Sequence, residues 1–586
     1  MIHGKGICVD LSKKKSTIMT LQPGLIKQFL GGNGIGAHLL YEHVKTHTAS
    51  SPDNWLVFVP GVLNGSTFPM TSKCGFFSLS PLTGAFGESY FGASLGVALK
   101  SEGYDFIALT GRCDILSYVL IDGQCSIEQA SDLEGLTTSA CETILTEKHD
   151  GSCACIGPAG EHQVAFAAIV GDGRQAGRTG MGAVLGSKQV KAIVVVPEAI
   201  PIDKKSIRPL RKKCVKGFLE GKGYPAYQGY HSFGTGKSIL PFSETFGILP
   251  TENFEHSQFE GASRIDTTHW KDEITRSVGC HGCMIACGKV YKGISDPEFE
   301  TLYALGSNLL CDDIEVIAEG NRLCDELGMD TISMGGVLGY VMSLSKEKIL
   351  QEKIPFGHGD TILSLIEKTA YREGIGNELA EGVQALSTRY GNDYHAVHVL
   401  GLSPPAYDGR GIKGMALSFL TSPRGACHLR SSAYSVELPG TWEHFTADRF
   451  SSEGKEFVAW MENLMTVHDI LGTCKFTRDF YLPDIMSEML EAYTGLKMSP
   501  EELLEIGERT FNLEWMFNIR NGVRIGAMPP KFKTPIKEGP SQGSHITDED
   551  TQRMKKDYCA ARGWNTEGIP QKNTIERLHL PPLEIR

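Results

Sequence analysis

The sequence lacks any apolar run that would cross a membrane. A spanning helix needs about 18 or more consecutive apolar residues, and the longest candidates, such as residues 335–344, are the size of a core helix. Residues 1–6 also lack the basic and apolar segments of a cleaved secretion signal. We therefore expect a cytoplasmic protein with no membrane span.

Positive charge is scarce as well. The 57 Lys and Arg residues are outnumbered by 69 Asp and Glu, which gives a formal net charge of -12. Nucleic-acid binding usually requires a basic face, so nucleic acid is not an expected partner. The chain also has no repeat of fixed period and no long low-complexity tract. Its composition of 41 % hydrophobic and 22 % charged residues is typical of a folded globular protein.

Glycine and cysteine are unusually frequent. The chain has 67 glycines and 16 cysteines in 586 residues, and the glycine share of about 11 % exceeds an average near 7 %. Glycine gathers in segments such as 31–36 and 173–182, which indicates tight turns or backbone brought close to a ligand. Without a secretion signal, disulfide bonds are not the expected use of the cysteines.

The chain changes character near residue 200, which predicts an α+β fold with a β-rich N-terminal domain and two mainly helical domains. Short strand-like runs occur at 6–11, 55–59, 106–110, 118–121, 164–170 and 191–196. Apolar residues with helical spacing occupy 302–310, 314–327, 331–344, 360–371 and 500–512. A proline-bounded segment, 197–201, and Pro404-Pro405 set domains of 1–200, 201–399 and 400–586. Residues 528–550 are predicted to be a surface arm.

Three cysteines stand within eight residues. Cys280, Cys283 and Cys287 are separated by two and three residues, which brings three thiols around one small centre. Either an iron–sulfur cluster or a zinc ion then needs a fourth ligand. The spacing favours the cluster over a zinc knuckle, with His281 as a bystander, but the local motif leaves both open.

One short pattern, Asp-x-x-Gly-x followed by Asp or Cys, occurs twice. The copies are residues 325–330 and 469–474. A carboxylate beside a glycine turn can accept two N–H bonds from a bicyclic amino-heterocycle such as a pterin. The second copy ends in Cys474, a natural fourth ligand for the cluster.

These motifs resemble those of the aldehyde:ferredoxin oxidoreductases, which hold tungsten on two pterins beside a [4Fe–4S] cluster. Further matching segments run over nearly the whole chain, at 80–84, 156–161, 180–188, 404–411 and 421–428. The resemblance implies a cofactor at the interface of the domains, with tungsten or molybdenum on the pterins. It also implies a Mg²⁺ ion that bridges the pterin phosphates.

The resemblance assigns roles to individual residues. It implies that Cys280, Cys283, Cys287 and Cys474 bind the [4Fe–4S] cluster. It implies a wider set of residues that contact the pterins, their phosphates or the magnesium ion: Lys73, Arg178, Gly180, Gly182, Ala183, Asp325, Asp330, Arg430, Asp469 and Cys474. Lys73 stands where the family commonly has an arginine.

The resemblance also implies the reaction and its partners. Glu300 and His428 would lie near the metal and transfer protons during oxidation of an aldehyde to a carboxylate. Electrons would leave through the cluster to ferredoxin or to a small iron–sulfur subunit, in an oligomer or heteromer. Two alternatives remain: another reaction of the family, such as acid or aryl-CoA reduction, and a cofactor-free binding protein stabilised by zinc.

Overall fold

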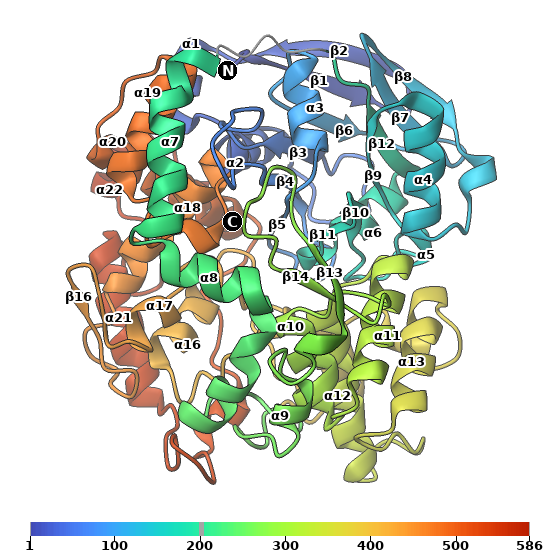
Figure 1. The fold of residues 1–586 in the computed structure, drawn as a ribbon, viewed down its shortest axis with the longest axis vertical. Coiled ribbons are helices and arrows are strands. Elements are labelled where there is room, and N and C mark those ends of the chain that lie inside the picture. The colour runs from blue at the N-terminus through green and yellow to red at the C-terminus, as the bar shows by residue number, and fades with distance from the viewer. Residues whose placement is uncertain (1, 199–203, 585–586) are drawn as a thin grey trace.

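A computed structural model describes residues 2–198 and 204–584. The segment 197–201 and the boundary expected at residue 200 therefore fall largely outside the described residues. Figure 1 shows the N-terminal third in the upper half of the molecule and the helical remainder below and to one side. The prediction of a β-rich N-terminal part followed by a helical region is confirmed.

The N-terminal part is built from two six-stranded sheets of the same topology. The first has the order β2-β1-β6-β3-β4-β5 and the second the order β8-β7-β12-β9-β10-β11 when read from its hairpin edge. In each sheet, the first strand of the hairpin pairs in parallel with the strand that comes last along the chain, β1 with β6 and β7 with β12. All other pairs are antiparallel. The architecture is thus duplicated, although the sequence shows no fixed-period repeat.

The strands of both sheets are short and mostly buried. The first sheet consists of β1 (Lys5–Asp10), β2 (Lys15–Thr20), β3 (Leu56–Pro60), β4 (Cys74–Leu79), β5 (Phe86–Phe91) and β6 (Ile107–Thr110). The second consists of β7 (Ser117–Asp122), β8 (Gln124–Gln129), β9 (Ser152–Cys155), β10 (Ile169–Gly171), β11 (Arg174–Ala176) and β12 (Val190–Val195). Five of the six expected runs are strands. The run at 164–170 is wrong for most of its length, because residues 164–168 form a turn and an irregular segment whose backbone bonds to the helical region, for example the Ala165 amide to the Ala380 carbonyl.

The helices agree closely with their apolar spacing. The longest are α2 (Gly32–His43), α4 (Thr138–His149), α7 (Lys204–Glu220), α8 (Tyr224–Phe233), α11 (Ile314–Leu327), α12 (Thr331–Lys346), α13 (Gly359–Tyr371), α16 (Lys413–Thr421), α18 (Phe457–Leu471), α19 (Pro483–Thr494), α20 (Pro500–Arg520) and α21 (Asp548–Arg562). The run at 302–310 differs, because it forms a π turn and a 3₁₀ turn instead of an α-helix. Among the described residues, no helix is long and apolar enough to span a membrane.

The hydrophobic core is shared between the parts of the chain. Its largest cluster contains Leu63 of the first sheet's loops, Leu338 of α12 and Trp515 of α20. The boundary predicted near residue 400 stays a prediction. The segment 528–550 is not a simple surface arm, since Phe532 and Ile546 are fully buried in the same cluster.

Candidate active site

A cavity of about 580 Å³ lies where the two sheets meet the helical region. The cavity is lined by side chains from β5, the β11 turn, the loop that carries Cys280, Cys283 and Cys287, helix α11, residues 424–438 and the residues after α18. Ten of the residues singled out in the sequence reach it: Lys73, Arg178, Cys280, Cys283, Cys287, Glu300, Asp325, Asp330, His428 and Cys474. A volume of this size is typical of cofactor pockets.

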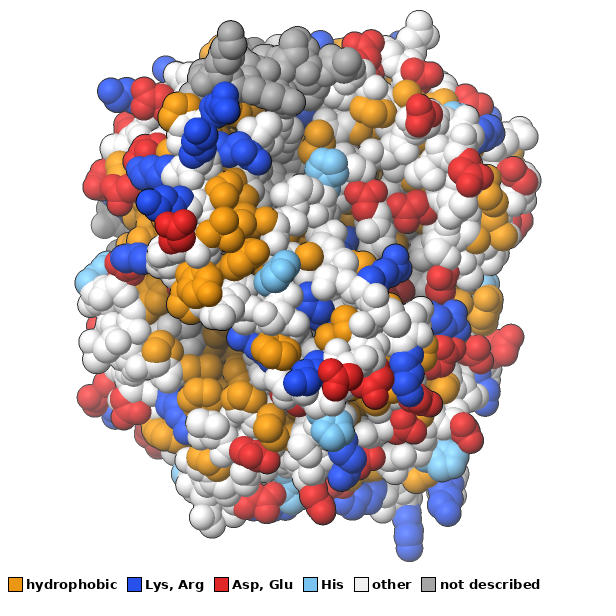
Figure 2. Space-filling model, viewed as in Figure 1, with side chains coloured by type: hydrophobic (Ala, Val, Ile, Leu, Met, Phe, Trp, Pro, Cys, Tyr) orange, Lys and Arg blue, Asp and Glu red, His pale blue; other side chains and the backbone are white. Residues whose placement is uncertain are grey.

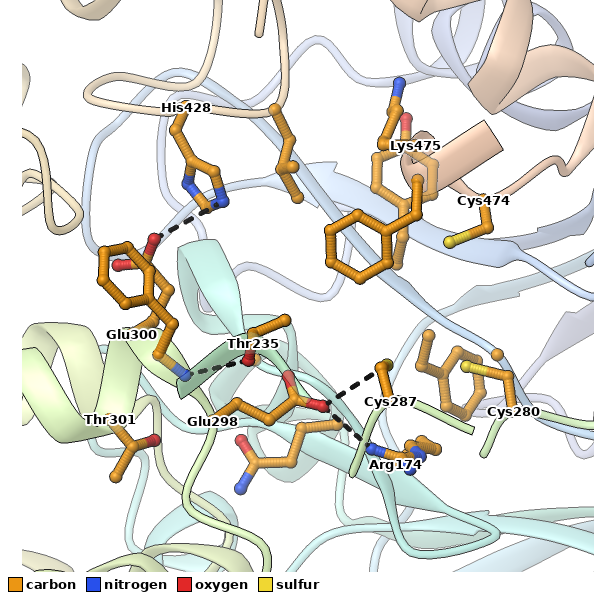
Figure 3. A pocket seen from close by; sticks show the side chains of 18 of the residues that line it. Arg174, Thr235, Cys280, Cys287, Glu298, Glu300, Thr301, His428, Cys474 and Lys475 are labelled. Atoms are coloured by element: carbon orange, nitrogen blue, oxygen red, sulfur yellow. Dashed lines mark hydrogen bonds and ion pairs between the residues drawn. The ribbon is translucent and has the colours of Figure 1, made fainter. Parts of the chain in front are cut away.

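Four thiols gather at one end of this cavity. Cys280, Cys283 and Cys287 lie in the loop between β13 (Ile274–Val278) and β14 (Gly288–Tyr291), and Cys474 approaches from the end of α18. Figure 3 shows three of them on one side of the pocket, across from His428. Gly92 makes room for the loop, because a side-chain carbon there would meet the Cys280 sulfur at 2.3 Å.

The thiols influence one another and the half-buried Lys73. Burial raises the pKa of Cys474 to about 11, and nearby Cys283 and Cys280 add to the rise. Burial alone would lower the pKa of Lys73, but the charges of Cys280, Cys474 and Cys287 outweigh it and raise that pKa. Lys73 is therefore placed to offset negative charge at the thiol end.

The donor set at this end is four thiols. Thiolates are soft donors, and four of them are the usual ligands of an iron–sulfur cluster, although they also bind zinc. Among residues 2–198 and 204–584, no three His, Cys, Asp or Glu side chains already stand in an arrangement that would hold a metal ion.

The two Asp-x-x-Gly patterns adopt the same local structure. In each, the aspartate lies in the last turn of a helix and the glycine ends that helix in the left-handed region, with φ of 77° at Gly328 and 78° at Gly472. The second residue after the glycine lies in the cavity wall, as Asp330 in one copy and Cys474 in the other. The repeat in the sequence thus corresponds to a repeat in structure.

Each copy docks on the loops of one sheet. The Ala168 amide donates to the Gly328 carbonyl, next to the second sheet, at 2.9 Å. The Lys73 amide donates to the Gly472 carbonyl, next to the first sheet, at the same distance. The duplicated sheets therefore present the two aspartate motifs to a common space.

The first aspartate faces the cavity and the second does not line it. Asp325 accepts hydrogen bonds from Gln175 at 2.5 Å and from Asn321 at 2.9 Å, and burial raises its pKa to about 8. Asp469 is buried beside Lys475 at 2.8 Å and Arg430 at 3.4 Å.

Arg430 belongs to a network inside the protein. Its guanidinium bonds to Glu88 of β5 at 3.0 Å and to Glu514 of α20 at 2.6 Å, besides Asp469. The side chain is only 1 % exposed and does not line the cavity. Its contact with the cofactor stays a prediction, and its contacts in the structure make it a positioning residue for Asp469.

The glycines of the 180–183 turn are explained by protein packing. A side chain at Gly180 would meet the Ala165 carbonyl at 2.1 Å, and one at Gly182 would meet the Ala168 carbonyl at 2.3 Å. Neither glycine nor Ala183 lines the cavity. The absence of a side chain is therefore required by the 165–168 loop, and a role in holding phosphate or magnesium stays a prediction.

Glu300 and His428 face each other at the end of the cavity opposite the thiols. Glu300 Oε1 lies 3.5 Å from His428 Nε2, and its other oxygen accepts the Ala406 amide at 2.9 Å. Burial raises the pKa of Glu300 to about 8 and lowers that of His428 well below its ordinary value. Burial therefore favours the uncharged form of both groups, a carboxylic acid beside a neutral imidazole.

The neighbouring Glu298 points the other way. It lies 3.3 Å from Arg174 and 3.9 Å from the Cys287 sulfur, at the thiol end of the pocket (Figure 3). Of the two glutamates, Glu300 alone reaches His428, and the prediction that assigned the proton-transfer role to Glu300 rather than Glu298 stays consistent with this geometry.

Sequence reasoning missed several cations of the cavity wall. Arg174, Arg424, Lys475 and Arg478 line the cavity together with Lys73 and Arg178. Arg174 Nη2, Arg424 Nε and Arg478 Nε are buried without a hydrogen-bond partner among the described residues. The available signal was their position: Arg174 is in the glycine-rich 173–182 segment and Arg424 in the 421–428 segment. Lys475 and Arg478 follow the second aspartate motif. Buried donors of this kind need an acceptor.

Two family models match the chain one after the other. The model described as aldehyde ferredoxin oxidoreductase, N-terminal domain, covers residues 7–197, and the one described as domains 2 & 3 covers residues 217–580. The chain belongs to the aldehyde ferredoxin oxidoreductase family. The resemblance drawn from the cysteine and aspartate motifs is thereby confirmed.

Relatives of this family match over nearly full length. A tungsten-containing aldehyde ferredoxin oxidoreductase of Thermococcus kodakarensis is 34 % identical over 604 residues, with 98 % of both chains covered. A more distant relative is the aliphatic sulfonate oxidoreductase, WOR-like subunit, of Pyrococcus furiosus, at 26 % over 634 residues, covering 98 % of this chain and 96 % of that one.

A solved structure shares the fold. The active site complex BamBC of benzoyl coenzyme A reductase, in complex with 1,5-dienoyl-CoA, superposes with a TM-score of 0.82 at 21 % identity. The match covers 99 % of this chain and 97 % of that one. At this identity the likeness shows the fold of the family and not the reaction.

The wall of the cavity suits an anionic cofactor such as the bis-pterin that the sequence resemblance implies. Six cationic side chains surround it, and four of them, Arg174, Arg178, Arg424 and Arg478, have a buried nitrogen without a hydrogen-bond partner among the described residues. Pterin phosphates are anionic acceptors that suit guanidinium groups. The thiols suit the iron–sulfur cluster, so the residues present fit both groups.

Proposed function

We propose that this protein oxidises aldehydes to carboxylic acids with a tungsten bis-pterin cofactor and passes the electrons through a [4Fe–4S] cluster to ferredoxin or a small iron–sulfur subunit. The observation that carries the proposal is the division of one cavity into two ends. A buried carboxylic acid faces an imidazole at one end, and four thiols gather at the other.

Cofactor binding is assigned to the cationic wall and the aspartate motifs. Cys280, Cys283, Cys287 and Cys474 hold the cluster. Asp325, Asp330 and Asp469 hold the pterins, and Lys73 and Arg178 bind at the phosphates or the cluster edge. When bound, tungsten supplies the two-electron oxidation, and the cluster supplies one-electron exit.

Glu300 and His428 move the protons of the reaction. The protonated imidazole is disfavoured here, so His428 acts as a neutral hydrogen-bonding group toward the aldehyde oxygen. Glu300, with its pKa raised to about 8, exchanges a proton with the attacking water near working pH. A general base or acid is most effective when its pKa lies near that pH.

The aromatic side chains around the pair exclude water from it. Tyr407 stacks on His428 with ring centroids 5.4 Å apart, and Tyr407 and Tyr434 stack at 4.8 Å. Phe242 and Phe299 meet edge to face at 4.9 Å. Such a wall strengthens the electrostatic interactions of the pair and accepts an apolar aldehyde.

The deciding experiment is elemental and kinetic analysis of protein purified without oxygen from cells grown with tungstate or with molybdate. We expect about four iron atoms per chain, tungsten in a pterin complex, and aldehyde-dependent reduction of a viologen dye. Acid or aryl-CoA reduction without aldehyde oxidation would favour another reaction of the family. Zinc without iron, tungsten or pterin would overturn the proposal in favour of a zinc-stabilised binding protein.

A further inference from the structure

Helix α7 carries a strongly basic face on an acidic protein. Residues 208–222 contain six Lys or Arg and one acidic residue, whereas the whole chain has a net charge of -12. Ile207, Cys214 and Phe218 are buried at helical spacing and fix which side of α7 packs inward. The basic side chains are exposed: Arg208, Arg211, Lys212, Lys213, Lys216 and Lys222.

Much of this charge is not neutralised. Lys213 pairs with Glu488 at 2.9 Å and Lys216 with Glu220 at 3.7 Å, both at the exposed surface, where such pairs contribute little. Among the residues that the structure describes, Arg208 and Lys212 form no ion pair. The face therefore keeps a positive potential.

Apolar surface adjoins the basic side chains. Leu219 at the end of α7 and Tyr224 at the start of α8 are each 40 % exposed. Figure 2 shows Lys and Arg side chains gathered over α7 and an apolar patch beside them. A charged rim next to an apolar centre is the usual composition of a protein–protein interface.

This surface rests on the two segments that carry the thiols. Gly217 of α7 packs directly on the Phe480 ring, a few residues after Cys474. On α8, Tyr230 stacks on Phe476 at 4.2 Å. His231 of α8 contacts the Ile285 carbonyl of the cysteine loop at 3.0 Å.

The thiol end also comes close to the surface beside these helices. His281 and Gly282, at the tip of the cysteine loop, are exposed, and Cys280 and Cys283 are only partly buried. Glu300 and His428 lie at the other end of the cavity, away from this opening (Figure 3). Electrons that leave through the thiols therefore reach the surface next to α7 and α8.

We propose that the basic face of α7 and the adjoining apolar surface at Leu219 and Tyr224 form the docking site for a small acidic iron–sulfur electron carrier. The inference rests on the proposed function. Oxidation of one aldehyde and one water gives a carboxylate, three protons and two electrons. A one-electron carrier must therefore dock and leave twice in each turnover.

Charge complementarity makes this repeated docking fast. A positive patch attracts an acidic carrier and raises its association rate by about 10- to 1,000-fold, and salt screens the effect. A pair held mainly by rim charges also separates readily, because such charges act on association more than on affinity.

The test is the double variant Arg208→Glu/Lys212→Glu of the full-length holoenzyme. Aldehyde turnover is measured with a small acidic [4Fe–4S] ferredoxin and, separately, with benzyl viologen. We expect kcat/KM for ferredoxin to fall by about 10-fold or more at low salt and the difference from wild type to shrink as salt is raised. Turnover with benzyl viologen should not change.

A matched control reverses the same number of charges elsewhere. Lys348→Glu/Lys353→Glu alters two exposed lysines between α12 and α13, at the opposite end of the molecule in Figure 1. It should leave both acceptors' kinetics as in wild type. Equal ferredoxin kinetics in the α7 variant and the control would overturn the docking site, as would a wild-type enzyme that reduces viologen and not ferredoxin.

The outcomes separate this inference from the proposed function. If wild-type protein with a full iron and tungsten content reduces neither acceptor with any aldehyde, the proposed function fails. If it reduces viologen with aldehyde and the α7 variant is unimpaired with ferredoxin, the docking surface alone fails. Iron content and thermal unfolding of the variant show whether the charge changes left the fold intact.

Discussion

Burial gives Glu300 and His428 properties that the same residues would lack at the surface. Burial favours the uncharged form of both, and each has a buried polar atom without a hydrogen-bond partner among the described residues, Glu300 Oε1 and His428 Nδ1. Unsatisfied polar groups of this kind are costly. Their persistence at the end of a cavity is typical of groups that await a substrate or a cofactor.

Changing Glu300 or His428 to Gln should therefore impair chemistry and spare assembly. We expect aldehyde turnover to fall by about 10²–10⁴, the usual contribution of a positioned acid or base. The double variant should lose little more than either single variant, because both side chains act on one transition state. Tungsten, pterin and iron contents are measured alongside. Turnover like that of wild type in both single variants contradicts the assignment.

The raised pKa of Glu300 also predicts a pH dependence. If the carboxylate accepts the proton of the attacking water, it must be ionised. The rate should then rise as the pH increases through about 8 and level off above it. We expect this rise in kcat/KM for wild type and its disappearance in Glu300→Gln. Identical profiles for the two proteins would assign the ionisation to another group.

Replacing Cys474, which stands 187 positions after Cys287, tests whether it is the fourth ligand of the cluster. Replacing it by Ala should lower the iron content and the broad visible absorbance, because three thiols remain for a cluster that needs four ligands. The control is Cys8→Ser, which changes a half-buried cysteine of β1 that does not line the cavity and should keep full iron. Four iron atoms per chain in Cys474→Ala would end the fourth-ligand assignment.

At the scale of elements, the helix ends that carry the aspartate motifs depend on their glycines. Gly472 has φ of 78°, and a side chain there would meet the Lys73 carbonyl at 2.6 Å and the Gly61 α-carbon at 2.9 Å. Gly495 ends α19 with nearly the same φ, 76°, and nothing lies within 4 Å of its added carbon. Both positions require a left-handed backbone, which strains any other residue. They differ in how closely other atoms would pack against an added side chain.

Alanine at these two glycines should thus have unequal effects. Gly495→Ala should lower the free energy of unfolding only by the cost of a left-handed backbone at alanine, about 1–2 kcal/mol. Gly472→Ala adds an overpacking cost of about 1–3 kcal/mol and displaces Cys474, so it should also reduce iron content. Thermal unfolding and iron analysis of both variants check this. An equal loss of stability in the two, with iron retained, would show that the contact with the first sheet is not needed.

At the scale of the whole molecule, buried charge networks join the sheets to the helical region. Arg430 connects Glu88 of β5 with Asp469 of α18 and Glu514 of α20. A second buried pair, Arg562 with Glu462 at 2.6 Å, lies wholly among helices. Removing one partner of a buried pair leaves an uncompensated charge and costs about 3–5 kcal/mol.

The two networks predict different outcomes for equivalent variants. Arg430→Met and Arg562→Met should both lower the midpoint of thermal unfolding. Arg430→Met alone should also lower tungsten and pterin content, because Asp469 loses the partner that orients it. If Arg430→Met unfolds at the wild-type temperature, the network does not stabilise the protein. If its tungsten content is normal, Arg430 has no role in holding the cofactor.

Much of the helical region could be predicted from sequence because helical spacing is a local signal. Residues 314–327 form α11 with the expected bounds, and 331–344 lie within α12. The run at 302–310 is no regular α-helix, because Gly306, with φ of -97° and ψ of -98°, leaves helical geometry where the π turn meets the 3₁₀ turn. The strand predicted over 164–168 is absent, because a short apolar stretch has the pattern of a strand even when its backbone bonds to the helical region and not to a sheet.

The sequence by itself determined the kinds of chemistry: the thiol set, the two aspartate motifs and the Glu300 and His428 candidates, each visible in short spacing or in family motifs. The tertiary structure decided which of these share one cavity, because partners such as Glu300 and His428 stand 128 positions apart. It also decided that the Arg430 network is internal and that two sheets repeat one topology. Local patterns fix residue types and turns, whereas burial, charge and contact over long separations arise only when the chain is folded.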